Sequence, residues 1–164
     1  PQELARCDSA YWTSHRYAPE IVDALNAAID QAKKEAGATS LRLFGYSGGG
    51  SLAILAASRR TDVTAIVTVA SNIDHDAWTR LDGDTPLYGS LNAADVANRV
   101  SHIPQIHFVG MDDDVVPALV SAPFLRHTRD PSRIPIVEVP GADHIYCWGE
   151  KWPALLQPHG PRSR

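Results

Sequence analysis

The feature that most constrains the fold is the stretch of residues 41–53, in which a short apolar run leads into Gly45-Tyr46-Ser47-Gly48-Gly49. Residues 51–58 then have the composition of a helix. The pattern Gly-x-Ser-x-Gly between a strand and a helix presents a serine hydroxyl on a sharp, strained turn at the carboxyl end of the strand. We expect both glycines of the pattern, Gly45 and Gly49, to be required because side chains there would push strand and helix apart. The alternative is a glycine-rich turn without chemistry.

Length and charge exclude several classes of protein. The chain has 164 residues, of which 44% are hydrophobic and 21% charged, so it is expected to form one domain over residues 1–164 with a core of its own. The formal charge of −4 argues against non-specific nucleic-acid binding, which needs a basic face. No apolar run approaches the ~18 residues of a membrane span. The sequence shows no signal peptide and begins with Pro1, which predicts a processed protein or an excerpt.

Strand-like and helix-like segments alternate along the chain. The expected strands are residues 41–45, 64–70, 105–110 and 134–139, and the expected helices are residues 19–37, 51–60, 92–100, 117–128 and 148–156. Residues 1–18 and 158–164 are expected to be irregular, and residues 71–91 to form a long polar loop. Apolar strands separated by helices predict an α/β fold with one parallel sheet covered by helices on both faces. Ligands of such sheets bind at the carboxyl ends of the strands.

Acidic residues and a histidine follow the third and fourth expected strands. A serine hydroxyl needs a general base, and the base needs an orienting group. The order serine, acid, histidine is met by Ser47, then Asp112, Asp113 or Asp114, then His144. Two alternatives for the acidic trio remain open, namely a solvated loop and a weak cation site that also uses Asp74, His75 and Asp76.

His144 is the only one of seven histidines with both the right order and the right place. The others precede the serine or the acid, lie within expected strands or helices, or fall in the tail; they are His15, His75, His102, His107, His127 and His159. We expect His144 to accept the Ser47 proton and later to protonate the leaving group. The backbone N–H of Gly48 is the expected first oxyanion donor, and no HGG-type sequence upstream of Ser47 supplies a second.

Three motifs in this order, GYSGGG at 45–50, GMDDDVVP at 110–117 and PGADH at 140–144, resemble the α/β-hydrolase superfamily over residues 19–157. The resemblance implies that Asp113 is the acid of the triad, with Asp112 as the runner-up. It also places a lid or pocket wall at residues 71–91. The substrate contacts it suggests are Tyr46, Asn72, Trp78, Leu87 and Tyr88, although a loop pinned by buried aromatic side chains is the alternative.

The chain departs from this superfamily because it lacks the front half of the fold, so that the serine turn follows the first expected strand. It is therefore a fragment, a minimal hydrolase whose residues 1–18 supply the second donor, or a remnant without activity. The first strand is expected at a sheet edge, where self-association is possible. Cys7 and Cys147 form either one bridge or two separate thiols. Cys7 and the following Tyr11-Trp12-Thr13 resemble secreted or lipoprotein hydrolases of bacteria.

The resemblance implies a serine hydrolase that cleaves a small carboxylic ester through an acyl-enzyme, without a metal or organic cofactor. Peptidase, thioesterase and acyltransferase chemistry use the same triad and remain open. The rival from a different class is a non-catalytic module that kept the fold and acts by binding a partner.

Overall fold

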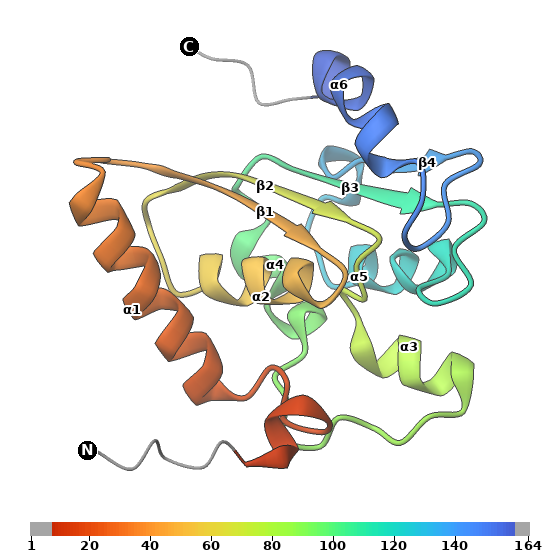
Figure 1. The fold of residues 1–164 in the computed structure, drawn as a ribbon, viewed down its shortest axis with the longest axis horizontal. Coiled ribbons are helices and arrows are strands. Elements are labelled where there is room, and N and C mark those ends of the chain that lie inside the picture. Colours follow the sequence, from red (N-terminus) through yellow and green to blue (C-terminus); the bar gives the residue numbers. More distant parts are fainter. Residues whose placement is uncertain (1–7, 160–164) are drawn as a thin grey trace.

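A computed structural model describes residues 8–159, which fold around one four-stranded parallel sheet (Figure 1). The strands are β1 (Leu41–Tyr46), β2 (Val63–Val69), β3 (Gln105–Gly110) and β4 (Ile136–Val139). They lie in the order β1-β2-β3-β4, so each strand pairs with the next along the chain. All four carboxyl ends therefore meet at one edge, and β1 is an outermost strand. The α/β fold class expected from the sequence is confirmed.

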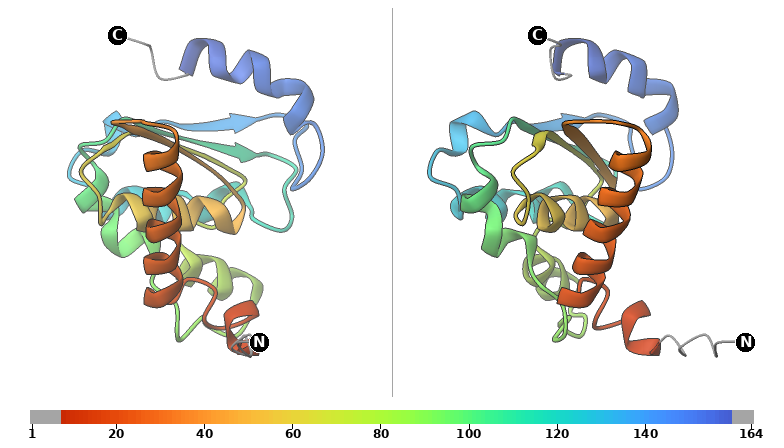
Figure 2. Two further views of the ribbon diagram at one scale, coloured as in Figure 1. Left: turned by 60° about the vertical axis from the view of Figure 1, so that its left-hand side comes forward. Right: turned by 90° about the vertical axis from the view of Figure 1, so that its left-hand side faces the viewer.

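Helices lie on both faces of the sheet, unevenly distributed (Figures 1 and 2). One face carries α1 (Pro19–Glu35), α2 (Gly48–Ala57), α4 (Ala97–Val100) and α5 (Ala122–Arg126), and the other carries α6 (Trp148–His159). The α2 face holds the larger core, because α2 is apolar nearly all round and its Ile54, Leu55 and Ala56 are fully buried. The site-forming turn after β1 is thus anchored by a buried helix.

The α6 face is only partly covered. Trp152 of α6 packs edge-on against Phe44 of β1 and Phe108 of β3, with ring centroids 6.2 and 6.0 Å apart. Phe44 nevertheless remains 52% exposed, and Arg42 beside it on β1 is exposed as well. Helix α6 therefore covers this face of β1 only in part, and no strand of residues 8–159 pairs with the outer edge of β1.

The expected long loop at 71–91 contains a helix, α3 (His75–Asp82), so that prediction was wrong in part. Asp74 caps its start by accepting a hydrogen bond from the backbone N–H of Ala77, at 3.1 Å. Gly83 ends it in the left-handed conformation, with φ of 69°. The polar character of the stretch reflects the exposed face of this short helix.

Other element boundaries also differ from the sequence prediction. Helix α2 begins at Gly48 rather than Ser51, since the glycine run is itself helical. The helix expected at 117–128 is divided into a 3-10 turn, η3 (Ala118–Val120), and α5. The segment at 92–100 likewise consists of η2 (Ala93–Val96) followed by α4. One further 3-10 turn, η4 (Pro131–Arg133), precedes β4.

The described part of the N-terminal segment includes a 3-10 helix, η1 (Ser9–Trp12), and α6 extends into the expected tail as far as His159. Cys147 forms no disulfide within residues 8–159. Cys7 lies outside the described residues, so the cysteine pairing stays a prediction. None of the helices in the described part combines the length and apolar character that a membrane crossing requires.

Candidate active site

The backbone at Ser47 is strained, as a serine turn between strand and helix requires. Ser47 has φ of 50° and ψ of −129°, a conformation that side-chain-bearing residues rarely adopt. Its N–H donates to the carbonyl oxygen of Val69 on the neighbouring strand at 2.9 Å, and its own carbonyl accepts from the N–H of Gly50 at 3.0 Å. These two bonds hold the turn between β1 and α2 and project the Ser47 side chain above the carboxyl ends of the strands.

Of the two glycines expected to be required around Ser47, the structure supports Gly45 but not Gly49. A Cβ on Gly45 would lie 2.4 Å from the carbonyl oxygen of Gly49, so strand and helix would have to separate. A Cβ on Gly49 would meet no atom within 4 Å, so the expectation of a steric need there was wrong. Gly50 is the second close approach, because its Cβ would lie 2.2 Å from the Ser71 hydroxyl oxygen. The helix packs on the strand through Gly45 and Gly50.

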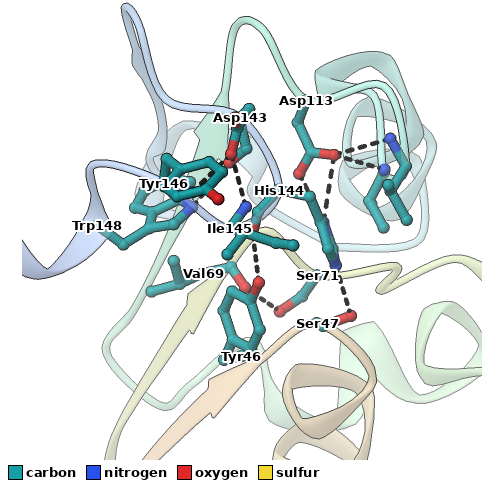
Figure 3. A network of polar contacts seen from close by, with 12 residues as sticks. Tyr46, Ser47, Val69, Ser71, Asp113, Asp143, His144, Ile145, Tyr146 and Trp148 are labelled. Carbon is teal, nitrogen blue, oxygen red and sulfur yellow. Dashed lines mark hydrogen bonds and ion pairs between the residues drawn. The ribbon is translucent and has the colours of Figure 1, made fainter.

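Ser47, His144 and Asp113 lie in one hydrogen-bonded line (Figure 3). The His144 Nε2 atom is 3.1 Å from the Ser47 Oγ atom. On the other side of the ring, Nδ1 is 2.9 Å from one Asp113 carboxylate oxygen and 3.2 Å from the other. A carboxylate accepts only, so Nδ1 carries the proton and Nε2 is free to accept the Ser47 proton.

The structure distinguishes Asp113 from its acidic neighbours. The Asp113 side chain is buried, and Oδ1 accepts hydrogen bonds from the backbone N–H groups of Val115 at 3.0 Å and Val116 at 2.7 Å. Asp112 and Asp114 are exposed and do not contact the His144 ring. A Cβ on Gly110 would lie 2.4 Å from the Ala142 carbonyl oxygen, so this glycine lets the acid loop and the His144 loop meet.

Two side chains hold the loop that carries His144 (Figure 3). The Tyr46 hydroxyl donates to the His144 carbonyl oxygen. Asp143 accepts from the backbone N–H groups of Tyr146 and Ile145 at 2.6 and 2.7 Å, and these bonds hold the pKa of its carboxyl below the usual value. The loop is thus fixed by its own backbone and by β1, independently of the triad contacts.

A cavity of about 650 Å³ opens beside the serine. Ser47 and Gly48 line it together with Asn72 and Trp78, two of the five pocket residues expected from the sequence. The other three lie elsewhere: Tyr46 contacts the His144 loop, Leu87 is buried beside a second cavity, and Tyr88 is 79% exposed. The remaining wall was not foreseen and consists of Tyr11, Trp12, Arg16, Tyr17, Ile21, Leu52, Val115 and Val116.

Tyr17 is the most closely placed of these unforeseen residues. It is only 2% exposed, and its hydroxyl donates to the Asn72 side-chain oxygen at 3.1 Å. Burial raises the pKa of this hydroxyl. A Cβ on Gly48 would lie 2.7 Å from the Tyr17 oxygen, so the tyrosine touches the expected oxyanion donor. The sequence signal was the aromatic content of residues 1–18, which does not indicate which ring packs inward.

The alternative cation site has no structural basis within residues 8–159, where no group of three or more histidine, cysteine, aspartate or glutamate side chains could hold a metal ion. The Asp74 carboxylate instead accepts from the Asn92 side-chain amide at 2.9 Å and caps α3. His75 stacks on the Tyr17 ring, with centroids 5.9 Å apart. These groups serve the packing of the cavity wall.

Comparison with solved structures identifies the fold. The chain is 18% identical to a monoacylglycerol lipase of Paleococcus ferrophilus, with a TM-score of 0.62, covering 85% of this chain and 75% of the lipase. A Pyrococcus furiosus esterase is 17% identical to it, with a TM-score of 0.66, and the match covers 87% of this chain and 63% of the esterase. An α/β serine hydrolase homologue from Coxiella burnetii is 17% identical to it, with a TM-score of 0.64, and the match covers 98% of this chain and 62% of the homologue. No family model and no curated protein matches the sequence.

The chain therefore has the α/β-hydrolase fold. It spans between 62% and 75% of the length of these three structures. The likeness extends to the arrangement of strands and helices, and at this level of identity it concerns the fold alone. What the chain does has to be argued from its own site.

Proposed function

We propose that this chain is a serine hydrolase that cleaves a small carboxylic ester through an acyl-enzyme. The observation that carries the proposal is the line of contacts from Ser47 Oγ to His144 Nε2, at 3.1 Å, and from His144 Nδ1 to Asp113, at 2.9 Å. Nucleophile, base and orienting group thus come from three separate loops at one edge of the sheet. An incidental surface cluster would not combine this order with a strained serine and a buried acid.

In the first half of the reaction, His144 Nε2 takes the Ser47 proton as Oγ attacks the ester carbonyl carbon. The buried Asp113 carboxylate faces Nδ1–H and stabilises the imidazolium that forms. The protonated Nε2 then donates to the alcohol oxygen of the ester as the carbon–oxygen bond breaks. In the second half, water loses a proton to Nε2 as its oxygen attacks the acyl carbon. Nε2 then returns that proton to Ser47 Oγ as the bond between Oγ and the acyl carbon breaks, which releases the acid and restores Ser47.

The tetrahedral oxyanion needs hydrogen-bond donors placed before the reaction begins. Gly48 is the first residue of α2, and the first N–H groups of a helix have no partner within it. The Gly48 N–H is therefore available beside Ser47, supported by the positive end of the α2 dipole. The nearby Tyr17 hydroxyl already donates to Asn72, so it is committed to that amide.

Hydrolysis of a short-chain p-nitrophenyl ester, measured beside Ser47→Ala, tests the proposal. We expect turnover that the substitution abolishes, and a single fluorophosphonate adduct on Ser47 by intact mass. Leu52→Ala serves as a control in the same cavity that leaves the triad in place. Equal background release from both proteins, with no adduct, would contradict the proposal.

Absence of the adduct would favour the binding-module alternative. The observation on its side is the single backbone donor, Gly48, identified for the oxyanion within residues 8–159. A fluorophosphonate reacts with the activated serine only once. Labelling therefore depends less on oxyanion stabilisation than repeated ester turnover does. Labelling without turnover would therefore indicate a competent triad with an incomplete oxyanion site.

A further inference from the structure

The cavity beside Ser47 lies on the acyl side of the bond to be cleaved. His144 must protonate the leaving alcohol, so the alcohol lies on the His144 side of the serine. The carbonyl oxygen lies toward the oxyanion donor, Gly48, and the acyl chain takes the remaining direction, away from the leaving alcohol and His144. The cavity is lined by Ser47 and Gly48, and His144 is not among its lining residues within 8–159. The acyl group is therefore the part of the substrate that this cavity receives.

The wall of the cavity is mostly apolar and aromatic. Trp12, Trp78 and Leu52 contribute to it, and such a surface favours a hydrocarbon or aromatic chain. Arg16 is the only charged residue among the lining residues within 8–159. Arg16 is exposed, so it offers an anion a charged partner beside an otherwise apolar wall and gains nothing from a neutral chain.

The Arg16 guanidinium is available to a ligand. Its Nε–H donates to the carbonyl oxygen of Thr13 at 3.0 Å, and no carboxylate of residues 8–159 forms an ion pair with it. Asp84 lines the adjoining cavity with Arg16 and Trp78 but is not within ion-pair distance.

We propose that the preferred substrates are esters whose acyl group is an apolar chain ending in an anionic group, with Arg16 binding that group. This inference rests on the proposed ester hydrolysis and names its substrate class. The acyl chain of the substrate lies against Trp12, Trp78 and Leu52. Its terminal carboxylate meets Arg16, and the ester carbonyl reaches Ser47. Arg16 is thus a specificity-determining residue.

Mono-p-nitrophenyl esters of glutarate, adipate and suberate, each compared with its methyl-capped neutral counterpart, test the proposal. Rates are normalised to alkaline hydrolysis so that intrinsic reactivity cancels. We expect kcat/KM to favour the anionic ester by about fivefold at the best length, the size of a partly exposed ion pair. Added salt should reduce the preference by screening.

Variants at Arg16 separate recognition from folding. Arg16→Gln should remove the preference for the anionic over the capped ester, measured as the ratio of the two kcat/KM values in the same variant, and Arg16→Lys should retain part of it. Arg42→Gln removes the same charge from the exposed face of β1, far from the cavity, and should leave the preference intact. Hydrolysis of both ester types without any preference would overturn this inference alone. No turnover of either, with Ser47 unlabelled, would overturn it together with the proposed function.

Discussion

The indole N–H of Trp78 donates to the carbonyl oxygen of Val115 at 2.7 Å. Trp78 lies on α3, in the segment expected to be a lid, and Val115 belongs to the turn that surrounds the Asp113 carboxylate. The same indole lines the cavity beside Ser47. One side chain therefore forms part of the wall of the cavity beside Ser47 and also fixes the turn that holds Asp113.

This contact predicts a coupled effect of Trp78→Phe. The substitution retains an aromatic ring but loses the hydrogen bond, which is worth about 1 kcal/mol. We expect KM to rise and kcat to fall by several-fold, because both the pocket and the Asp113 turn loosen. Steady-state kinetics would show it. Leu81→Ala, at an exposed position of the same helix, is the control; an equal effect there would point to α3 stability instead.

The choice of Asp113 over Asp112 predicts opposite results for two isosteric changes. Asp113→Asn presents an amide to His144 Nδ1 and favours the wrong ring tautomer, so kcat should fall by about 10³–10⁴-fold. Asp112→Asn alters an exposed side chain and should leave kcat unchanged. Thermal unfolding of both variants establishes that they fold. A large loss in Asp112→Asn would reverse the assignment.

The glycines of the serine turn predict a difference in stability. Gly45→Ala places a methyl group 2.4 Å from the backbone oxygen of Gly49, and we expect it to cost about 1–3 kcal/mol in the free energy of unfolding. Gly49→Ala, in the first turn of α2, meets open space and should stabilise by up to ~1 kcal/mol. Urea unfolding of the two variants measures whether the free energy of unfolding falls in the first and rises in the second. Similar destabilisation by both would contradict the geometry.

His107 predicts a loss of stability in acid. The ring is fully buried between Thr68, whose hydroxyl lies 2.8 Å from Nδ1, and Phe124, and burial lowers its pKa from 6.5 to about 3. The unfolded chain binds a proton that the folded chain excludes, so stability present above pH 6.5 declines as the pH falls toward 3. The slope is about 1.4 kcal/mol per pH unit. Urea unfolding at several pH values measures this decline, and the His107→Gln variant should lack the part that comes from His107.

The outer edge of β1 predicts self-association through a second copy of the chain. No strand of residues 8–159 pairs with this edge, and Phe44 and Tyr46 are 52% and 47% exposed beside it. Sedimentation velocity over a concentration series should show a dimer that Phe44→Lys weakens. A monomer at every concentration would remove this prediction.

Local patterns in the sequence were sufficient for much of this fold. The parallel strands follow from short β-branched and apolar runs. The order serine, acid, histidine singled out Ser47, the trio Asp112–Asp114 and His144, and the resemblance to α/β-hydrolases chose Asp113, the member of the trio that the structure brings to His144. Such features depend on neighbours in sequence and on the single layer arrangement open to alternating strands and helices. The position of α3 was missed because a capped two-turn helix with a polar face resembles a loop in composition.

The cavity beside Ser47 depended on tertiary structure alone. Tyr17, Trp78 and Val116 lie far apart in the sequence and meet in its wall, because α3, the acid turn and the segment that joins η1 to α1 converge over the carboxyl ends of the strands. Gly49 shows the same limit, since whether a glycine faces open space or another backbone depends on packing that its neighbours in sequence do not encode. The sequence by itself determined which groups can react; the convergence of distant segments decided which of them face Ser47, and placed Arg16 as the one charge in the cavity wall within residues 8–159.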